Sequence, residues 1–157
     1  MDYLENIPFD ELRVGDSTTM TRTVTERDIQ LFAYLSGDIN PLHLDEEYAR
    51  STPFSTRIAH GLFVGLLVTT AVATRMPGPG TIYRSQEMKF HRPVKIGDTV
   101  TAALTLIEKK KRGNLVKIEF EMTNQHGEVV FSGVSTAVAP SEKIRVKAAE
   151  LPQVHFS

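Results

Sequence analysis

The chain has 157 residues, close to the roughly 150 expected of one domain, so it can bury a hydrophobic core without a disulfide or a metal. Hydrophobic residues make up 41% of it and charged residues 24%, which is typical of a globular protein and unlike a disordered one. The 18 Lys and Arg residues nearly balance the 19 Asp and Glu residues, which disfavours a nucleic-acid-binding protein, and the absence of cysteine excludes disulfides, thiolate metal sites and thiol nucleophiles.

The N-terminal segment is acidic and lacks a basic stretch followed by an apolar one, so it does not resemble a signal peptide. The most apolar segment, residues 61–73, is shorter than the roughly 20 residues that cross a bilayer. We therefore expect a cytoplasmic protein that acts on a small molecule, with no nucleic-acid partner and no membrane.

The first half of the chain is predicted to be largely helical, after one or two short extended pieces that include residues 18–24. Thr25 followed by Asp28 predicts a helix start, because a Thr cap and an acidic first turn both stabilise that end of a helix. Apolar residues at helical spacing continue this helix to Gly37, which can end it in the left-handed conformation. A turn follows at residues 38–41, since Pro41 disfavours a helical conformation of the residue before it.

Two further helices are predicted before the chain changes character. Asp45 can cap a short helix over residues 46–50, and a polar loop covers residues 51–59. The second helix runs from Gly61 to about Arg75 and is apolar almost all round, which indicates that it is buried.

The second half is predicted to form strands with tight turns between them. The expected strands cover residues 81–90, 99–107, 115–123 and 128–138. The third of these alternates apolar and charged residues, as a half-buried antiparallel strand does. The pattern therefore predicts an α+β domain over residues 1–139 in which a sheet wraps one buried helix, followed by a C-terminal tail at 140–157.

Asp38 and His43 flank the Asn40-Pro41 turn and are candidates for chemistry. A carboxylate and an imidazole held together can take a proton from water and deliver one to carbon. The alternative interpretation is that Asp38 only caps the turn through its own backbone and that His43 is a half-buried aromatic residue.

His60 and Gly61 immediately precede the buried helix, whose first amides lack internal partners and carry the positive end of the helix dipole. A glycine there lets an oxyanion approach a backbone N–H, unless Gly61 is simply an N-cap without a ligand. Gly65 and Thr69 lie on the same helix face as Gly61, which leaves room for an acyl chain or for close packing against the sheet.

Other kinds of site find little support in the sequence. Asp38, His43 and His60 match no trusted metal-ligand spacing, so no metal site is expected. There is no dinucleotide fingerprint, P-loop or nucleophile elbow. The remaining histidines are expected at the surface. They are His91, His126 and His155.

Four segments resemble the MaoC-like (R)-specific enoyl-CoA hydratases. The first, Leu35 to Asp45, is similar to the family signature, and Ile58-Ala59-His60-Gly61 resembles its second block. Gly80 to Tyr83 and Phe90 to Asp98 resemble its later strands. The resemblance implies a hot-dog fold, in which an antiparallel sheet wraps a long central helix, and a homodimer or a higher homo-oligomer of dimers with active sites near the dimer interface.

The resemblance also implies the chemistry. Asp38 and His43 become the catalytic pair, which holds one water against a trans-2-enoyl thioester and adds it reversibly to give the (R)-3-hydroxyacyl-CoA. In this scheme His43 acts as the base toward water and Asp38 returns a proton to C2, the alternative being that the coupled pair shares both roles. No cofactor is implied, since coenzyme A belongs to the substrate. The resemblance extends to further residues, with Gly61, His60, Asn40 and Thr69 as oxyanion or substrate contacts. Separately, the positive charges of Lys89 and Arg92 make them candidate contacts for the CoA phosphates, the alternative being that they are solvated charges at a strand end.

Two alternative functions share this fold. Hot-dog acyl-CoA thioesterases often carry a catalytic carboxylate on the central helix, and residues 61–74 contain no Asp or Glu. A non-catalytic acyl-thioester binding subunit has no need of both Asp38 and His43. The sequence therefore favours the hydratase.

Overall fold

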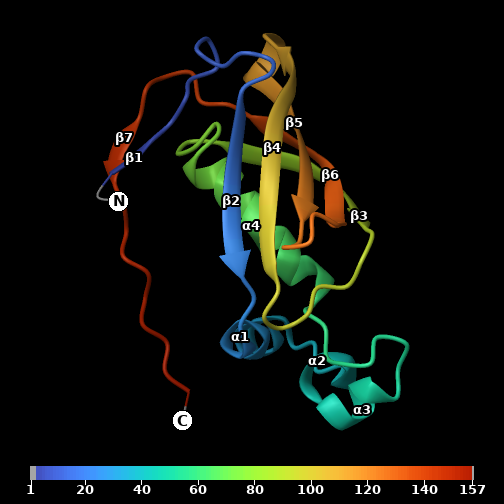
Figure 1. Ribbon diagram of the computed structural model, residues 1–157. Helices are drawn as coiled ribbons and strands as arrows, with labels where there is room; N and C mark the ends of the chain where they lie inside the picture. The colour runs from blue at the N-terminus through green and yellow to red at the C-terminus, as the bar shows by residue number, and fades with distance from the viewer. Residues whose placement is uncertain (1–2, 157) are drawn as a thin grey trace.

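The computed structural model describes residues 3–156, and its centre is a five-stranded antiparallel sheet that wraps one helix (Figure 1). The strand order is β2-β4-β5-β6-β3, so β2 and β3 lie at the two edges. The strands are β2 (Ser17–Thr23), β3 (Ile82–Phe90), β4 (Thr99–Lys110), β5 (Leu115–Thr123) and β6 (Val129–Val138), with a short 3₁₀ turn, η1 (Arg112–Asn114), between β4 and β5.

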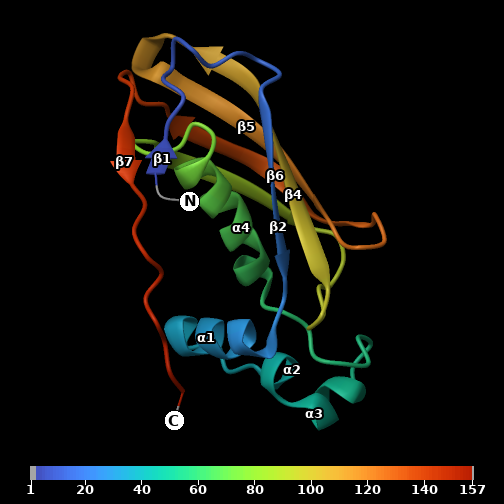
Figure 2. The same ribbon diagram turned by 60° about the vertical axis from the view of Figure 1, so that its left-hand side comes forward.

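The central helix is α4 (Gly61–Thr74), which packs along one face of the sheet (Figure 2). One face of this helix packs against the sheet, and the side chains between the two layers form one hydrophobic core. The helix predicted to be buried all round is therefore buried on one face only, since Leu62 and Leu66 on its outer face are exposed. The β5 side chains that reach this core are Val116, Ile118, Phe120 and Met122, each at most 1% exposed. The α+β hot-dog fold expected from the sequence is confirmed.

Three short helices lie between β2 and β3 in the chain and stand below the sheet in Figure 2. They are α1 (Glu26–Ser36), α2 (Pro41–Leu44) and α3 (Glu46–Arg50). The predicted capping is present, because Thr25 and Asp28 form a capping box at the start of α1, and Gly37 ends it with a φ of 74°. The turn predicted at residues 38–41 continues into α2, since Pro41 at its first position needs no N–H donor there.

The strand predictions differ from the structure mainly at β4. This strand continues to Lys110 instead of ending at residue 107, because Lys109 and Lys110 remain paired with Val116 and Leu115 of β5. Charged side chains are tolerated there since the strand end is near the surface.

Two short strands, one near each end of the chain, pair with each other. β1 (Tyr3–Glu5) pairs antiparallel with β7 (Arg145–Lys147), inside the segment expected to be a tail. Side-chain and main-chain atoms of Asn6 bond to residues 142–144, which strengthens this pairing. Beyond β7 the chain runs toward α1, where Arg27 donates to the main-chain oxygen of Val154 (Figure 1). Sequence periodicity missed β7 because three exposed residues are too few to show alternation.

No helix within residues 3–156 is both long enough and apolar enough to span a membrane.

Candidate active site

The turn after α1 holds Asp38 in a fixed orientation. Oδ1 of Asp38 accepts the N–H of Asn40 at 3.1 Å, and the Asp38 N–H donates to the hydroxyl of Ser36. Asn40 in turn caps α2, since its Oδ1 accepts the N–H of Leu42 at 3.0 Å. The capping interpretation of Asp38 is thus correct for one carboxylate oxygen and leaves the other, Oδ2, free for another partner.

His43 lies on α2 and has only 11% of its side chain exposed. Its Nδ1 is 2.8 Å from the main-chain oxygen of Ile58. Because a carbonyl oxygen can only accept, Nδ1 carries the hydrogen, and Nε2 of the neutral ring has the lone pair. The basic nitrogen of His43 is therefore the one that faces Asp38.

Oδ2 of Asp38 and Nε2 of His43 are 3.8 Å apart. This exceeds the roughly 2.7–3.2 Å of a direct N–H···O hydrogen bond. A single oxygen atom between them can bond to both groups at about 2.8 Å. The two side chains, predicted as a pair from their spacing, thus form a site of the size of one water-derived oxygen.

The carbonyl that fixes His43 is itself held from two sides. Ile58 donates its N–H to Leu42 and forms an isolated antiparallel bridge with Lys95, and Ala59 donates to the main-chain oxygen of Val94 at 2.7 Å. The segment before α4, expected to be a polar loop, is therefore joined at Ile58 to α2 and to the chain that enters β4. This explains how the main chain of a loop residue can orient the imidazole of His43.

Arg57 connects this segment to two helices and has 17% of its side chain exposed. Its guanidinium donates to Glu26 of α1 at 3.0 Å and lies 3.6 Å from the carboxylate of Glu46 on α3. The hydrogen bond from Arg57 lowers the pKa of Glu26, and the Arg57 main-chain amide, with the Thr56 hydroxyl, lowers the pKa of Glu46. Arg57 thus keeps the segment that carries Ile58 in contact with α1 and α3.

Arg57→Ala is expected to lower the Tm by about 2–4 °C at pH 7, because partly exposed ion pairs contribute modestly. The folded-state pKa values of Glu26 and Glu46 are lowered, so their stabilisation is present above the ordinary Glu pKa of about 4.3 and is lost as the pH falls through the lower folded values. Thermal unfolding at several pH values will show this: the difference from the native protein should shrink below about pH 4. A difference independent of pH would contradict the assignment.

Gly61 is the first residue of α4, and no side chain caps this helix. Its N–H belongs to the first turn, where amides lack internal partners. A Cβ at this position would lie 2.6 Å from the ring of Phe90, so the glycine permits β3 to approach the helix start closely. Gly61 and Phe90 together border two clefts.

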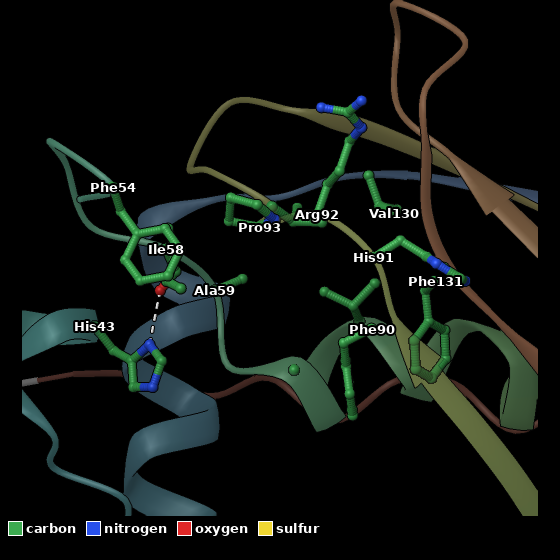
Figure 3. Close-up of a pocket in the computed structure, with 13 residues that line it drawn as sticks. His43, Phe54, Ile58, Ala59, Phe90, His91, Arg92, Pro93, Val130 and Phe131 are labelled. Atoms are coloured by element: carbon green, nitrogen blue, oxygen red, sulfur yellow. Dashed lines mark hydrogen bonds between the residues drawn. The ribbon is translucent and has the colours of Figure 1, made fainter.

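One cleft, of about 350 Å³, has His43 at its rim and mostly apolar side chains around it (Figure 3). We call it the His43 cleft. Its lining comprises His43, Phe54, Ile58, Ala59, Gly61, Val64, Phe90, His91, Arg92, Pro93, Val94, Val130 and Phe131. The other, the Asp38 cleft, of about 480 Å³, is lined by Phe32, Ser36, Asp38, His60, Gly61, Leu62 and Phe90. The Asp38–His43 pair and the N-terminus of α4 therefore lie where two clefts meet.

His60 is buried, with an exposed fraction of 2%. Its Nε2 is 3.1 Å from the main-chain oxygen of Asp38, and its ring stacks on that of His43 with centroids 3.9 Å apart. Burial lowers the pKa of His60, more than the hydrogen bond to Asp38 raises it. The ring is therefore neutral near pH 7.

The donor atoms of Asp38, His43 and His60 lie within 4.8 Å of one another. Only the Asp38 carboxylate and Nε2 of His43 are free to act as ligands, because Nε2 of His60 donates to a carbonyl and its Nδ1 is buried. Two ligands fall short of the three or more protein ligands of an ordinary zinc site.

The other candidate residues from the sequence lie farther from the Asp38–His43 pair and do not form one cluster. Thr69 is exposed on α4, two turns beyond Gly61, and its hydroxyl neighbours that of Tyr83, whose pKa is raised by burial. Arg92 borders the His43 cleft and lies 3.5 Å from Glu128, whereas Lys89 borders a separate depression with Glu119 and Glu121. The structure thus does not bring Lys89 and Arg92 to one cleft.

Some residues of the candidate site were not identified from the sequence. The Ile58 carbonyl, Arg57 and the aromatic wall of Phe54 and Phe90 act through backbone position or burial, for which sequence spacing gives no signal. His91, expected at the surface, is exposed and bonds to Ser132, yet it also borders the His43 cleft.

The fold and the site together define a hot-dog protein with an Asp–His pair beside the N-terminus of its central helix. A family model described as a MaoC like domain matches residues 13–130. The chain belongs to the MaoC-like dehydratase family.

Curated relatives and solved structures agree with this assignment. The chain is 43% identical over 137 residues to a protein of Rhodospirillum rubrum named (R)-specific enoyl-CoA hydratase, covering 85% of this chain and 92% of that one. A Methylorubrum extorquens protein named 3-hydroxybutyryl-CoA dehydratase is 42% identical over 110 residues, covering 68% of this chain and 70% of that one. The unliganded R-hydratase PhaJ1 from Pseudomonas aeruginosa is 46% identical over 99% of both chains, with a TM-score of 0.94.

Proposed function

We propose that this protein is an (R)-specific enoyl-CoA hydratase, a hydro-lyase that adds water reversibly to trans-2-enoyl-CoA and forms the (R)-3-hydroxyacyl-CoA. The observation that carries the proposal is the 3.8 Å separation between Oδ2 of Asp38 and Nε2 of His43, beside the first amides of α4. Relatives named for the hydration or the reverse dehydration support it.

The proton path follows from the hydrogen bonds around the pair. Nε2 of His43 takes a proton from the water as the water oxygen bonds to C3 of the substrate, since Nδ1 is already protonated toward Ile58. The resulting imidazolium faces the Asp38 carboxylate, and the pair passes a proton through Asp38 to C2. One hydrogen and one hydroxyl have then been added from the same side, and the pair regains its original charge.

Charge develops on the thioester oxygen while C3 is attacked. The N–H of Gly61 at the uncapped start of α4 is the donor that we assign to this oxygen, assisted by the positive end of the helix dipole. No cofactor enters this scheme, since coenzyme A is part of the substrate. We also propose Asn40, His60 and Thr69 as further residues of the site, with Asn40 shaping the turn. Arg92, which borders the His43 cleft, is proposed as a contact of the CoA phosphates, and Lys89, which borders a separate depression, is not.

The thioesterase alternative gains no support from the central helix. A carboxylate on α4 would serve that reaction, and residues 61–74 contain none. The acidic group of the site instead lies on the turn before α2, where it faces a histidine.

We further propose that the protein is a homodimer, or a larger assembly of dimers, joined through β3 and α4. β3 is an edge strand, and Met88 lies 3.9 Å from the Cβ position of Gly65 on the helix. Large apolar side chains on these two elements are 38–60% exposed: Leu62, Leu66, Ile82, Met88 and Phe90. Several exposed large apolar side chains on adjacent elements are typical of an interface. Location in the cytoplasm stays a prediction from the sequence.

The test is the ultraviolet absorbance of crotonyl-CoA mixed with the protein, with chiral analysis of the product and a thiol assay. Loss of the enoyl-thioester absorbance with (R)-3-hydroxybutyryl-CoA formed and no free thiol is the expected result. Release of free CoA would replace the hydratase with the thioesterase. An unchanged spectrum with enoyl-CoA substrates of every chain length tried would refute the proposed function.

A further inference from the structure

His60 contacts both members of the Asp38–His43 pair, although it lies 22 residues from one and 17 from the other in the sequence. It occupies the N-cap position of α4 but makes no capping bond there. Its ring is turned toward the Asp38 turn instead. This arrangement is unusual for a helix start, where a side chain ordinarily satisfies the free amides.

The hydrogen bond fixes the protonation of the ring. Nε2 of His60 faces the main-chain oxygen of Asp38, which can only accept, so Nε2 carries the hydrogen. Nδ1 is buried and has no hydrogen-bond partner within the described residues. A second proton on Nδ1 would be a buried, unpaired charge, which is costly. His60 is therefore a neutral donor in the geometry of this site.

The His60 ring also packs on the His43 ring and restrains its orientation. The two rings have centroids 3.9 Å apart and planes 28° apart, and Phe32 packs on His60 at 4.8 Å. The hydrogen bond to Ile58 fixes one nitrogen of His43, and the stacked ring restrains the tilt about that bond. Nε2 of His43 is thereby directed at Oδ2 of Asp38.

The next residue along the chain is Gly61, whose N–H at the start of α4 is the donor that we assign to the thioester oxygen. One short segment thus holds the Asp38 backbone, the His43 ring and the oxyanion donor at fixed positions relative to one another. A misplacement of about 1 Å between such groups can cost 100-fold in rate.

We infer that His60 is a positioning residue of the reaction, a neutral hydrogen-bond donor and stacking surface that sets the geometry of Asp38 and His43 and exchanges no proton with the substrate. The inference rests on the proposed function. It replaces the expectation of a direct substrate contact, because the exposed fraction of His60 is only 2%.

Two variants separate the two contacts. His60→Gln keeps an N–H donor at the reach of Nε2 and loses the aromatic ring, and His60→Phe keeps a stacking ring and loses the donor. Each is expected to lower kcat for crotonyl-CoA by about 10- to 100-fold with less than a threefold change in KM. His126→Gln and His126→Phe, in the exposed turn before β6, are the controls and should behave as the native protein.

The pH profile of kcat/KM should retain both limbs in the two His60 variants, since His60 takes no proton in the reaction. Loss of a limb, or a raised KM at unchanged kcat, would overturn the inference, as would unchanged kinetics in both variants. If neither variant folds, nitrogen-15 NMR of the native imidazoles decides: a neutral ring protonated on Nε2 is expected at pH 7, and an imidazolium at that pH would refute the inference. Activity of the native protein is measured first, so a failed hydratase proposal is distinguished from a failed role for His60.

Discussion

His43→Gln is expected to reduce kcat with crotonyl-CoA by about 10²- to 10⁴-fold, the usual contribution of a positioned acid–base group. Glutamine can still donate to the Ile58 carbonyl but cannot take a proton from water. Asp38→Asn should cause a loss of the same order, because an amide can neither accept nor return the proton. Both substitutions preserve side-chain size, and Asn can still accept the N–H of residue 40, so the turn should persist.

The pair is predicted to act as one unit. The double variant Asp38→Asn/His43→Gln should therefore lose little more activity than either single variant, as happens when residues serve the same step. His155→Gln, in the exposed C-terminal segment, is a control for the chemical change. Steady-state kinetics with circular dichroism of each variant provide the measurement. Independent, multiplying losses would indicate that the two side chains serve separate steps.

Gly61→Pro is expected to reduce kcat by about 10²- to 10³-fold, the cost of removing one oxyanion donor. The N–H of residue 61 is the only hydrogen-bond donor that the substitution removes, and proline is favoured there because Gly61 is the first helical residue. The preceding residue, His60, already has φ −59° and ψ 136°, which are the angles that a residue before proline adopts. The helix should therefore form normally.

The matched control is Gly61→Ala, which adds a Cβ but keeps the N–H. In both variants the new Cβ meets the Phe90 ring, so this contact is common to the two variants and cancels when they are compared. The ratio of kcat for the alanine and proline variants isolates the contribution of the N–H. A ratio near one would show that the oxyanion is stabilised by another group.

The sequence predicted the elements whose signals are local. The Thr25 capping box, the left-handed Gly37 and the alternation in β5 each arise from the conformational preferences of a few neighbouring residues, and each is present in the structure. The continuous apolar run from Gly61 predicted a core helix for the same reason, although only one face of that helix is buried. β7 and the last residues of β4 were missed, because their pairing depends on a distant partner strand and not on their own pattern.

Some features of the candidate site could likewise be predicted from local sequence, and others could not. Spacing across the Asn40-Pro41 turn was enough to suggest Asp38 with His43, because five residues of rigid chain bring the two side chains close. Which nitrogen of His43 is basic depended on the Ile58 carbonyl, 15 residues away, and the role of His60 depended on stacking across two segments. The sequence alone was enough to predict the fold class and to suggest the proposed reacting pair. The tertiary structure alone decided the tautomer, the orientation of the pair and its alignment with Gly61, because these depend on hydrogen bonds and ring contacts between segments that only folding brings together.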